Sequence, residues 1–426
     1  MDIAALSDTI LDGRTKGIPA NAAPFRLGDI AAQGWNVMAE DMPLPLMLLR
    51  RSNLDHNARV FAEYLAANDL SLAPHGKTTM SPQIFDEQLK SGAWGITAAT
   101  VQQARVMQHH GVDRIIMANQ LIGRAAVAGV VAMLRDAPAL DFYCFVDSIA
   151  QLDIVARHLA ADPPPRPIRV LLEVGVAGGR TGVRTRAEAQ ALAHAIAAAD
   201  MRHIRFGGVA AFEGVVPGIA DSDAPVRDYA QMVTDIAQAL PGSLLEGLEE
   251  FVLTGGGSGH FDIMADTFAT LKLPIPVRIV LRSGCYVTND SGAYFTAQEA
   301  ARKDPARGWK SQLKPALEIW AYVQSRPEPG LALLTMGKRD APYDAGLPVP
   351  FARHVPGTGP APVGEAEIFA MNDQHAFVRL PEGSDWAVGD MIGSGISHPC
   401  TAFDKWRFLP VVSDDYDVTG GVLTEF

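Results

Sequence analysis

Lys77 is the residue whose surroundings most clearly indicate chemistry. It stands in the stretch LAPHGKTTMSP (residues 72 to 82), after a short apolar run and before a helical pattern. A lysine in a loop is usually a solvated charge, whereas a lysine that ends a buried strand faces the site onto which the strand opens. Its amine can then act as a nucleophile toward a carbonyl carbon.

A glycine-rich stretch, TGGGSGH (residues 254 to 260), is a candidate phosphate site. It contains Gly256, Gly257 and Ser258, and a helical pattern follows it. The free backbone amides at the start of a helix bind phosphate well. A tight turn that needs positive φ angles would explain the same glycines. On this stretch alone, both interpretations remain open.

His398 and Cys400, in the stretch SHPC, are a candidate pair of metal ligands. If the stretch is a strand or its end, side chains two positions apart share one face. An imidazole and a thiolate together favour zinc over magnesium or calcium. A chance pair is the alternative, because zinc sites usually carry three or four protein ligands and only two are visible here.

The elements around these residues alternate regularly from about residue 70. Short, nearly continuous apolar runs are followed by segments of helical spacing, and the runs are SLAPH, WGITAA, DRIIMAN, DFYCFVD, IRVLLEVG, RFGGVAAFEG, EFVLTGGG and VRIVLRSG. Such runs are typical of strands buried on both faces, and the alternation indicates parallel pairing. Eight units predict an α/β fold, a (β/α)8 barrel over residues 46–290. A doubly wound sheet is the alternative.

The pattern changes after about residue 290. Alternating strands with glycine and proline turns replace the helical segments, and no long helical pattern remains. We therefore expect a second, mainly antiparallel β domain formed by residues 1–45 and 291–426. This domain would carry the metal pair.

A barrel places its chemistry at the C-terminal ends of the strands, and phosphate is often bound by the loops after strands seven and eight. Lys77 then follows strand one, and the glycine-rich stretch follows strand seven. A lysine opposite a phosphate site can hold pyridoxal 5′-phosphate (PLP), and Arg180, after strand five, can face its pyridine nitrogen. A surface salt bridge is the alternative for Arg180. Phe212, after strand six, and Tyr286, after strand eight, are further candidate cofactor contacts.

Seven segments carry a resemblance to a known family, and they follow one another in that family's order: PHGKTTMSP, GAWGITAATVQQARVM, DRIIMANQLIG, EVGVAGGRTGV, FEGVV, LTGGGSG and RSGCYVTND. The chain resembles the PLP-dependent D-serine dehydratase and D-threonine aldolase family, which has the alanine-racemase type of fold. The resemblance covers roughly residues 40 to 410. It implies that Lys77 carries the cofactor, that Arg180 faces the pyridine nitrogen, and that the phosphate is held by Gly256, Gly257 and Ser258.

The chain also departs from the family. Ala73 and Met80 stand where basic residues are common, and Phe212 stands where a tyrosine is common. These departures leave the substrate open. Dehydratases of the family carry His-x-Cys at the place of His398 and Cys400 and bind zinc, whereas the aldolases tend to carry His-x-Asp and another divalent metal.

The resemblance therefore favours a D-serine ammonia-lyase type of enzyme with Zn²⁺ as its divalent metal. It would convert D-serine, or a related β-hydroxy-D-amino acid, to a keto acid and ammonia. The alternatives are a D-threonine or 3-hydroxy-D-aspartate aldolase, an amino acid racemase with Tyr286 or Tyr294 as its second base, and a non-catalytic PLP carrier. The carrier is disfavoured because such proteins lack a β domain.

Composition limits the partners and the compartment. The chain has 426 residues and a net charge of −12, which disfavours nucleic acid and anionic membranes as partners. No signal peptide or membrane-spanning segment is expected. The widely spaced Cys144, Cys285 and Cys400 do not resemble a disulfide framework, so we expect the cytoplasm. The expected partners are a small D-amino acid and, by the resemblance, a second copy of the chain in a homodimer.

Overall fold

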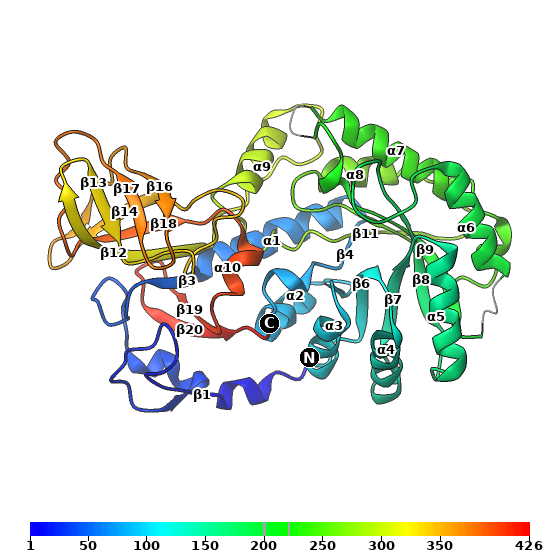
Figure 1. The fold of residues 1–426 in the computed structure, drawn as a ribbon, viewed down its shortest axis with the longest axis horizontal. Helices are drawn as coiled ribbons and strands as arrows, with labels where there is room; N and C mark the ends of the chain where they lie inside the picture. Colours follow the sequence, from blue (N-terminus) through cyan, green and yellow to red (C-terminus); the bar gives the residue numbers. More distant parts are fainter. Residues whose placement is uncertain (199–201, 220–221) are drawn as a thin grey trace.

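Parallel strands form a nearly closed barrel on one side of the molecule (Figure 1). The computed structural model describes residues 1–198, 202–219 and 222–426. In these residues the barrel sheet has eight strands, in the order β4-β11-β10-β9-β8-β7-β6-β5. Their bounds are β4 Ser71–Leu72, β5 Ile96–Ala98, β6 Arg114–Gln120, β7 Asp141–Val146, β8 Ile168–Val174, β9 Ile204–Ala211, β10 Phe251–Gly255 and β11 Val277–Leu281. The predicted (β/α)8 barrel is confirmed, and each predicted apolar run overlaps one of these strands.

The two end strands of this sheet, β4 and β5, approach each other through a single parallel bridge between His75 and Thr97. Helices connect successive strands and surround the barrel (Figure 1). They are α1 Arg51–Ala67, α2 Pro82–Lys90, α3 Val101–His109, α4 Arg124–Asp136, α5 Ile149–Ala161, α6 Arg186–Ala198, α7 Ala224–Gln238 and α8 Phe261–Phe268. Hydroxyl caps begin three of them: Thr100 accepts a hydrogen bond from Gln103 N at α3, Ser148 accepts one from Gln151 N at α5, and Thr185 accepts one from Glu188 N at α6.

The second domain is a sheet of ten strands within the described chain. It contains β3 Leu46–Arg50, β12 Leu317–Glu328, β13 Leu331–Leu334, β14 Val349–Val355, β15 Gly359–Ala361, β16 Glu367–Met371, β17 Ala376–Arg379, β18 Met391–Gly395, β19 Phe408–Val412 and β20 Val418–Leu423. Its pairs are antiparallel except for β19 with β3. The predicted, mainly antiparallel β domain is therefore confirmed.

Two expectations about element boundaries are corrected. The barrel was expected to begin at residue 46, but β3 pairs with β12 and β19 in the second sheet, so α1 is the first element of the barrel. No long helix was expected after residue 290, yet α9 (Ala293–Lys303) follows the last barrel strand. A short helix, α10 (Pro399–Phe403), also follows β18.

The N-terminal segment packs on the second sheet. It contains two short strands and two 3-10 helices, η1 Ala4–Asp8, β1 Ile10–Leu11, β2 Phe25–Arg26 and η2 Leu27–Gln33. Lys16 Nζ lies 2.8 Å from Asp340 Oδ1, and Val37 N donates to Tyr416 O. These contacts join Lys16 and Val37 to the β domain, whereas Met1 and Asp2 contact Asp86 and His110 of the barrel.

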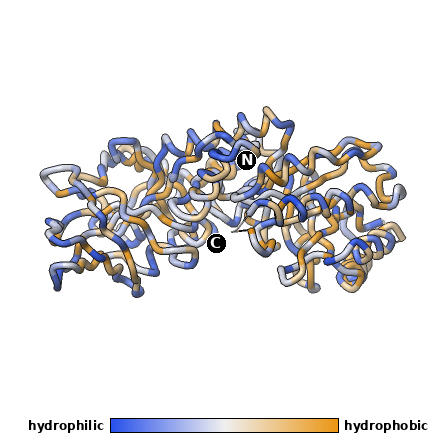
Figure 2. Tube along the Cα trace, turned by 90° about the horizontal axis from the view of Figure 1, so that it is seen from above, coloured by the Kyte–Doolittle hydropathy of each residue, from blue (hydrophilic) through white to orange (hydrophobic). Residues whose placement is uncertain are grey.

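An aromatic cluster joins the two domains. The Phe61 ring of α1 stacks on Tyr286 at 4.5 Å between centroids and also contacts Phe261 and Trp309. These residues belong to one hydrophobic core with the strands of the second sheet. Figure 2, seen from above, shows the two domains side by side with hydrophobic stretches in each. A shared hydrophobic core thus joins the two domains at their junction. Within the described residues, no helix is long and apolar enough to span a membrane.

Candidate active site

One cavity, of about 410 Å³, brings together most of the predicted site residues at the junction of the two domains. The barrel and the β domain both contribute to its walls, which include Lys77, Phe212, Gly257, Ser258, His398 and Cys400. A smaller cavity, of about 60 Å³, shares Lys77, Phe212 and Gly257 with it and is also lined by Arg180. Gly256 and Tyr286 line neither cavity.

Lys77 lies in a one-turn 3-10 helix, η3 (Gly76–Thr78), a few residues beyond the last paired residue of β4. Lys77 thus lies in a turn beyond the C-terminal end of the first barrel strand and not in the strand itself. Gly76 permits this turn because a Cβ there would lie 2.4 Å from the Met107 side chain and 2.9 Å from Ile96. The close packing of this glycine fixes where Lys77 enters the cavity.

His75 is the closest titratable neighbour in sequence and lines both cavities with Lys77. Loss of water contact, and then the charge of Lys77, lower the pKa of His75 well below its usual value. Its Nδ1 atom is buried and has no hydrogen-bond partner among the described residues. Buried polar atoms normally have a partner, so this nitrogen is one that a bound molecule can satisfy.

The glycine-rich loop leaves β10 in a conformation that only glycine adopts easily. Gly256 has a φ of +76°, and a Cβ there would lie 2.7 Å from Leu281. Gly257 and Ser258 follow it into the cavity wall, and α8 begins at Phe261. The loop therefore passes close to the cavity just before a helix start, which is the arrangement that binds phosphate.

Glu213 is a functional candidate that the sequence did not single out. It is 1% exposed, and its Oε1 accepts a hydrogen bond from Gly257 N in the glycine-rich loop. Its Oε2 is buried without a partner among the described residues. Burial raises the pKa of Glu213. A buried carboxyl group thus lies against the loop that was expected to hold an anion.

Arg282 supplies positive charge beside this carboxyl group. It is 5% exposed and donates to Thr254 Oγ1 at 2.7 Å and to Ala211 O at 2.6 Å. Burial lowers the pKa of Arg282 to about 10, although the nearby carboxylate of Glu213 opposes the shift. Arg282 lines both cavities and balances the local charge at the loop.

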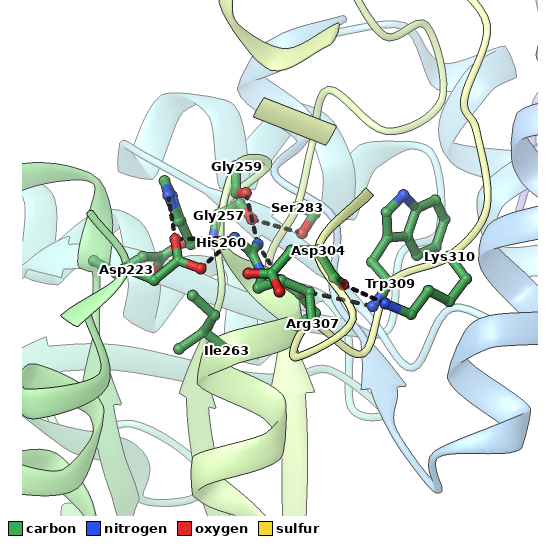
Figure 3. A network of polar contacts seen from close by, with 12 residues as sticks. Asp223, Gly257, Gly259, His260, Ile263, Ser283, Asp304, Arg307, Trp309 and Lys310 are labelled. Atoms are coloured by element: carbon green, nitrogen blue, oxygen red, sulfur yellow. Dashed lines mark hydrogen bonds and ion pairs between the residues drawn. The ribbon is translucent and has the colours of Figure 1, made fainter. Parts of the chain in front are cut away.

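A second buried arginine anchors the far end of the loop (Figure 3). Arg307, from the segment after α9, lies 2.5 Å from Asp262 Oδ1 and 3.0 Å from Asp223 Oδ1, and it donates to Gly259 O. Arg307 is 6% exposed and Asp262 is 1% exposed, so the charges compensate each other away from water. The network holds the loop between α7 and α9.

Arg180 follows β8 and lines the small cavity. Its guanidinium carbon lies 4.3 Å from the centre of the Phe212 ring, which is a cation–π contact. The pair lines the small cavity beside Lys77. This position, next to the lysine, is compatible with the predicted contact to a pyridine ring.

His398 and Cys400 reach the large cavity, but not from one strand face as expected. His398 directly precedes α10, and Cys400 lies in its first turn. His398 Nδ1 lies 2.6 Å from Asp344 Oδ2, and Asp344 Oδ1 accepts from Thr401 Oγ1 at 2.7 Å. Hydrogen bonds, first with Cys400 and then with Asp344, raise the pKa of His398 to about 9. The carboxylate fixes the ring and leaves its Nε2 for another partner.

Cys285 contacts Cys400, and the sequence alone did not predict this contact. The two sulfur atoms lie 3.7 Å apart, and Cys400 Sγ also donates to Thr78 Oγ1 at 3.4 Å. Hydrogen bonding, first with Cys285, lowers the pKa of Cys400. Within the described residues, no group of three or more His, Cys, Asp or Glu side chains is arranged to hold a metal ion. The predicted pair is thus a two-ligand arrangement of soft donors.

The two candidate tyrosines lie in different surroundings. Tyr294, at the start of α9, lines the large cavity near the cysteines. Tyr286 is 3% exposed and packs on Phe61 in the aromatic cluster. The structure therefore does not bring Tyr286 to the cavity, and of the two tyrosines proposed for a racemase only Tyr294 faces it.

Two family models match the chain, one in each domain. "Alanine racemase, N-terminal domain" matches residues 49–260, and "Putative serine dehydratase domain" matches residues 316–412. Among curated proteins, a D-threonine aldolase of an Arthrobacter species is 27% identical over 87% of this chain and 89% of its own length. A 3-hydroxy-D-aspartate aldolase of Paracoccus denitrificans is 22% identical over 80% of this chain and 82% of its own.

Solved structures agree with this match. D-threonine aldolase from Filomicrobium marinum superposes with a TM-score of 0.73 at 25% identity, covering 95% of this chain and 97% of the other. D-threo-3-hydroxyaspartate dehydratase from a Delftia species has the same fold, with a TM-score of 0.70 at 17% identity. The superposition covers 92% of this chain and 99% of the dehydratase chain. With the two domain matches and the cavity that joins Lys77 to the glycine-rich loop, these likenesses show that the chain is a PLP-dependent lyase of the D-serine dehydratase and D-threonine aldolase family, with an alanine-racemase fold.

Proposed function

We propose that the protein is a D-amino acid dehydratase that converts D-serine, or a related β-hydroxy-D-amino acid, to a keto acid and ammonia. The observation that carries this proposal is the single cavity lined by Lys77, His398 and Cys400. It combines an amine that can move a proton with a pair of soft metal donors. Loss of a β-hydroxyl group needs both functions, because hydroxide is a poor leaving group.

The residues present fit PLP. His75, whose Nδ1 is buried and has no partner among the described residues, lines cavities with Lys77, and the glycine-rich loop does so too. Lys77 would hold the cofactor carbonyl carbon, the loop its phosphate, and Arg180 its pyridine nitrogen. When bound, PLP supplies an electron sink for the bond broken at Cα. The amide of Gly257 is occupied by Glu213, so the loop would offer the phosphate the amides of Ser258 and Gly259 first.

The chain's own residues provide the proton chemistry. The Lys77 amine, which lines the cavity, would take the proton from Cα of the substrate. Because the pKa of His75 is lowered, its ring stays neutral and adds no second positive charge beside that amine. D-Serine would give pyruvate and ammonia, since the water lost at Cβ is regained when the C–N bond is hydrolysed.

His398 and Cys400 would hold the divalent metal, with Zn²⁺ as the proposed ion. Nitrogen and sulfur donors suit zinc, and the Asp344 contact to His398 Nδ1 leaves Nε2 for the metal. The ion would supply Lewis-acid assistance to the departing oxygen. One solved structure of the dehydratase named above is a cysteine-to-alanine variant in the metal-free form.

An aldolase is the second candidate, because the similar curated proteins are a D-threonine aldolase and a 3-hydroxy-D-aspartate aldolase. The thiol of Cys400, in place of a harder carboxylate ligand, favours dehydration. Incubation of the purified protein with D-serine, D-threonine and 3-hydroxy-D-aspartate tests both. We expect ammonia and a keto acid; glycine and an aldehyde without ammonia would establish the aldolase.

We further propose that the protein works as a homodimer in the cytoplasm. The family resemblance implies the dimer and the widely spaced cysteines favour the cytoplasm, and light scattering coupled to size-exclusion chromatography measures the mass of the assembly directly. A mass of one chain across a wide concentration range would contradict the dimer. Cell fractionation tests the compartment.

A further inference from the structure

Cys285 and Cys400 come from different domains and meet at the cavity. Cys285 begins the turn after barrel strand β11, and Cys400 lies in α10 of the β domain. Their sulfur atoms lie 3.7 Å apart, and both thiols are free. We propose that this pair is a redox modification site, at which oxidation forms an intramolecular disulfide that closes the active site.

The backbone around the pair holds the two thiols in place. A Cβ at Gly284 would lie 2.5 Å from Thr78 Oγ1 and 2.7 Å from His75 O, so the chain before Cys285 packs directly against the Lys77 turn. Cys400 Sγ donates to the same Thr78 Oγ1 at 3.4 Å. Thr78 therefore lies between the two segments. A disulfide bond is about 2.05 Å long, so the sulfurs need to approach by only about 1.6 Å.

Cys285 and Cys400 line the cavity, whereas the third cysteine, Cys144, does not. Cys400 is partly exposed. Cys144 is 0% exposed in barrel strand β7. Oxidation follows exposure, and a reactive cysteine beside a second thiol is the usual arrangement of a reversible redox site. Cytosolic disulfides of mesophilic proteins are generally of this transient kind.

The chemistry balances with a peroxide as the oxidant. The peroxide converts the Cys400 thiol to a sulfenic acid and releases one water. The Cys285 thiol then attacks that sulfur, forms the S–S bond and releases a second water. Two thiols lose two electrons and two protons, and the peroxide is reduced to two waters. A small thiol reductant reverses the reaction by exchange.

The bond would act at the active site itself. It would use the sulfur of Cys400, leaving His398 alone of the proposed metal pair, and it would join the two domains beside Lys77. Formation of the bond does not require the proposed dehydratase activity or a bound metal. Detection of the disulfide bond therefore tests this inference independently of the proposed function.

The experiment treats the purified full-length protein with hydrogen peroxide, and it counts thiols and maps peptides without reduction. We expect titratable thiols to fall from three to one, with a linked peptide pair two hydrogens lighter that contains Cys285 and Cys400. Cys144 should stay reduced, and dithiothreitol should restore three thiols and the initial activity. The variant Cys144→Ala should form the same link.

The variant Cys285→Ser tests the role of the second thiol. Without it, Cys400 should progress to sulfinic acid, which dithiothreitol does not reverse. Three reduced thiols in wild type after treatment, over-oxidised Cys400 without a link, or a link between two molecules would each overturn the proposal. A missing link in protein that still dehydrates D-serine would overturn this inference and leave the proposed function intact.

Discussion

The Nδ1 atom of His398 lies 2.6 Å from Oδ2 of Asp344, a residue 54 positions earlier in the chain. This contact fixes both the orientation of the ring and the nitrogen that faces away from the carboxylate. Histidines that bind metals usually donate their other ring nitrogen to such an acceptor. Asp344 is therefore a positioning residue for the proposed metal pair.

Replacing Asp344 by asparagine should weaken zinc binding by about ten- to a hundredfold, because the carboxylate that accepts a hydrogen bond from a metal-binding histidine sets the orientation and the basicity of its ring. Competition with a chromophoric chelator measures the affinity without any enzyme assay. The matched control is Asp373→Asn, an exposed aspartate that pairs with Arg339 on the surface. Equal zinc affinity in Asp344→Asn and wild type would contradict the role.

Lys77 should be the only lysine that carries the cofactor covalently. Borohydride reduction of the protein with PLP, followed by peptide mass spectrometry, should place the added mass on Lys77. The variant Lys77→Ala should remain unlabelled, whereas Lys90→Ala should be labelled as in wild type, since Lys90 pairs with Asp86 on α2. Label on any other lysine would refute the assignment.

Cys400 should decide the metal and the reaction. Cys400→Ala should lower pyruvate release from D-serine on the order of a hundredfold while D-serine still binds, because binding does not need the metal. Cys400→Asp should shift metal preference toward harder ions such as Mn²⁺. Metal analysis and the ammonia and aldehyde assays follow both changes. Full dehydratase activity of Cys400→Ala in metal-free buffer would show that the thiol has no metal role.

Glu213 should make the folded protein less stable as pH rises. Burial raises the pKa of Glu213, so the folded state binds its proton more tightly than the unfolded state. Its contribution to the free energy of unfolding should therefore fall from about pH 4.3, the ordinary value, up to the raised pKa, and stay constant above it. Glu213→Gln, which keeps an acceptor for Gly257 N, should lose this dependence.

Urea unfolding at a series of pH values measures the difference between Glu213→Gln and wild type. The exposed Glu246→Gln is the matched control and should follow wild type. If the stability difference between Glu213→Gln and wild type does not change with pH, burial does not raise the pKa of the Glu213 carboxyl group.

Local patterns in the sequence predict the barrel and much of the candidate site. Each strand of the barrel is a local apolar run followed by a helical pattern, and this alternation allows few topologies. Lys77 and the glycine-rich loop were predictable for the same reason, because each directly follows one of those runs. The His-x-Cys spacing of His398 and Cys400 also identifies them in the sequence as candidate metal ligands.

Which distant segments of the chain meet depends on the folded structure. The apolar run of β3 looks like a barrel strand, but its partners β12 and β19 place it in the other sheet. Tyr286 follows a barrel strand as the cavity residues do, yet it packs on Phe61. The contacts of Cys285 with Cys400 and of Asp344 with His398 join residues 115 and 54 positions apart. No local pattern encodes such pairs, because the cysteine pair forms only where the two domains meet and the Asp344–His398 pair only where two distant segments of the β domain come together.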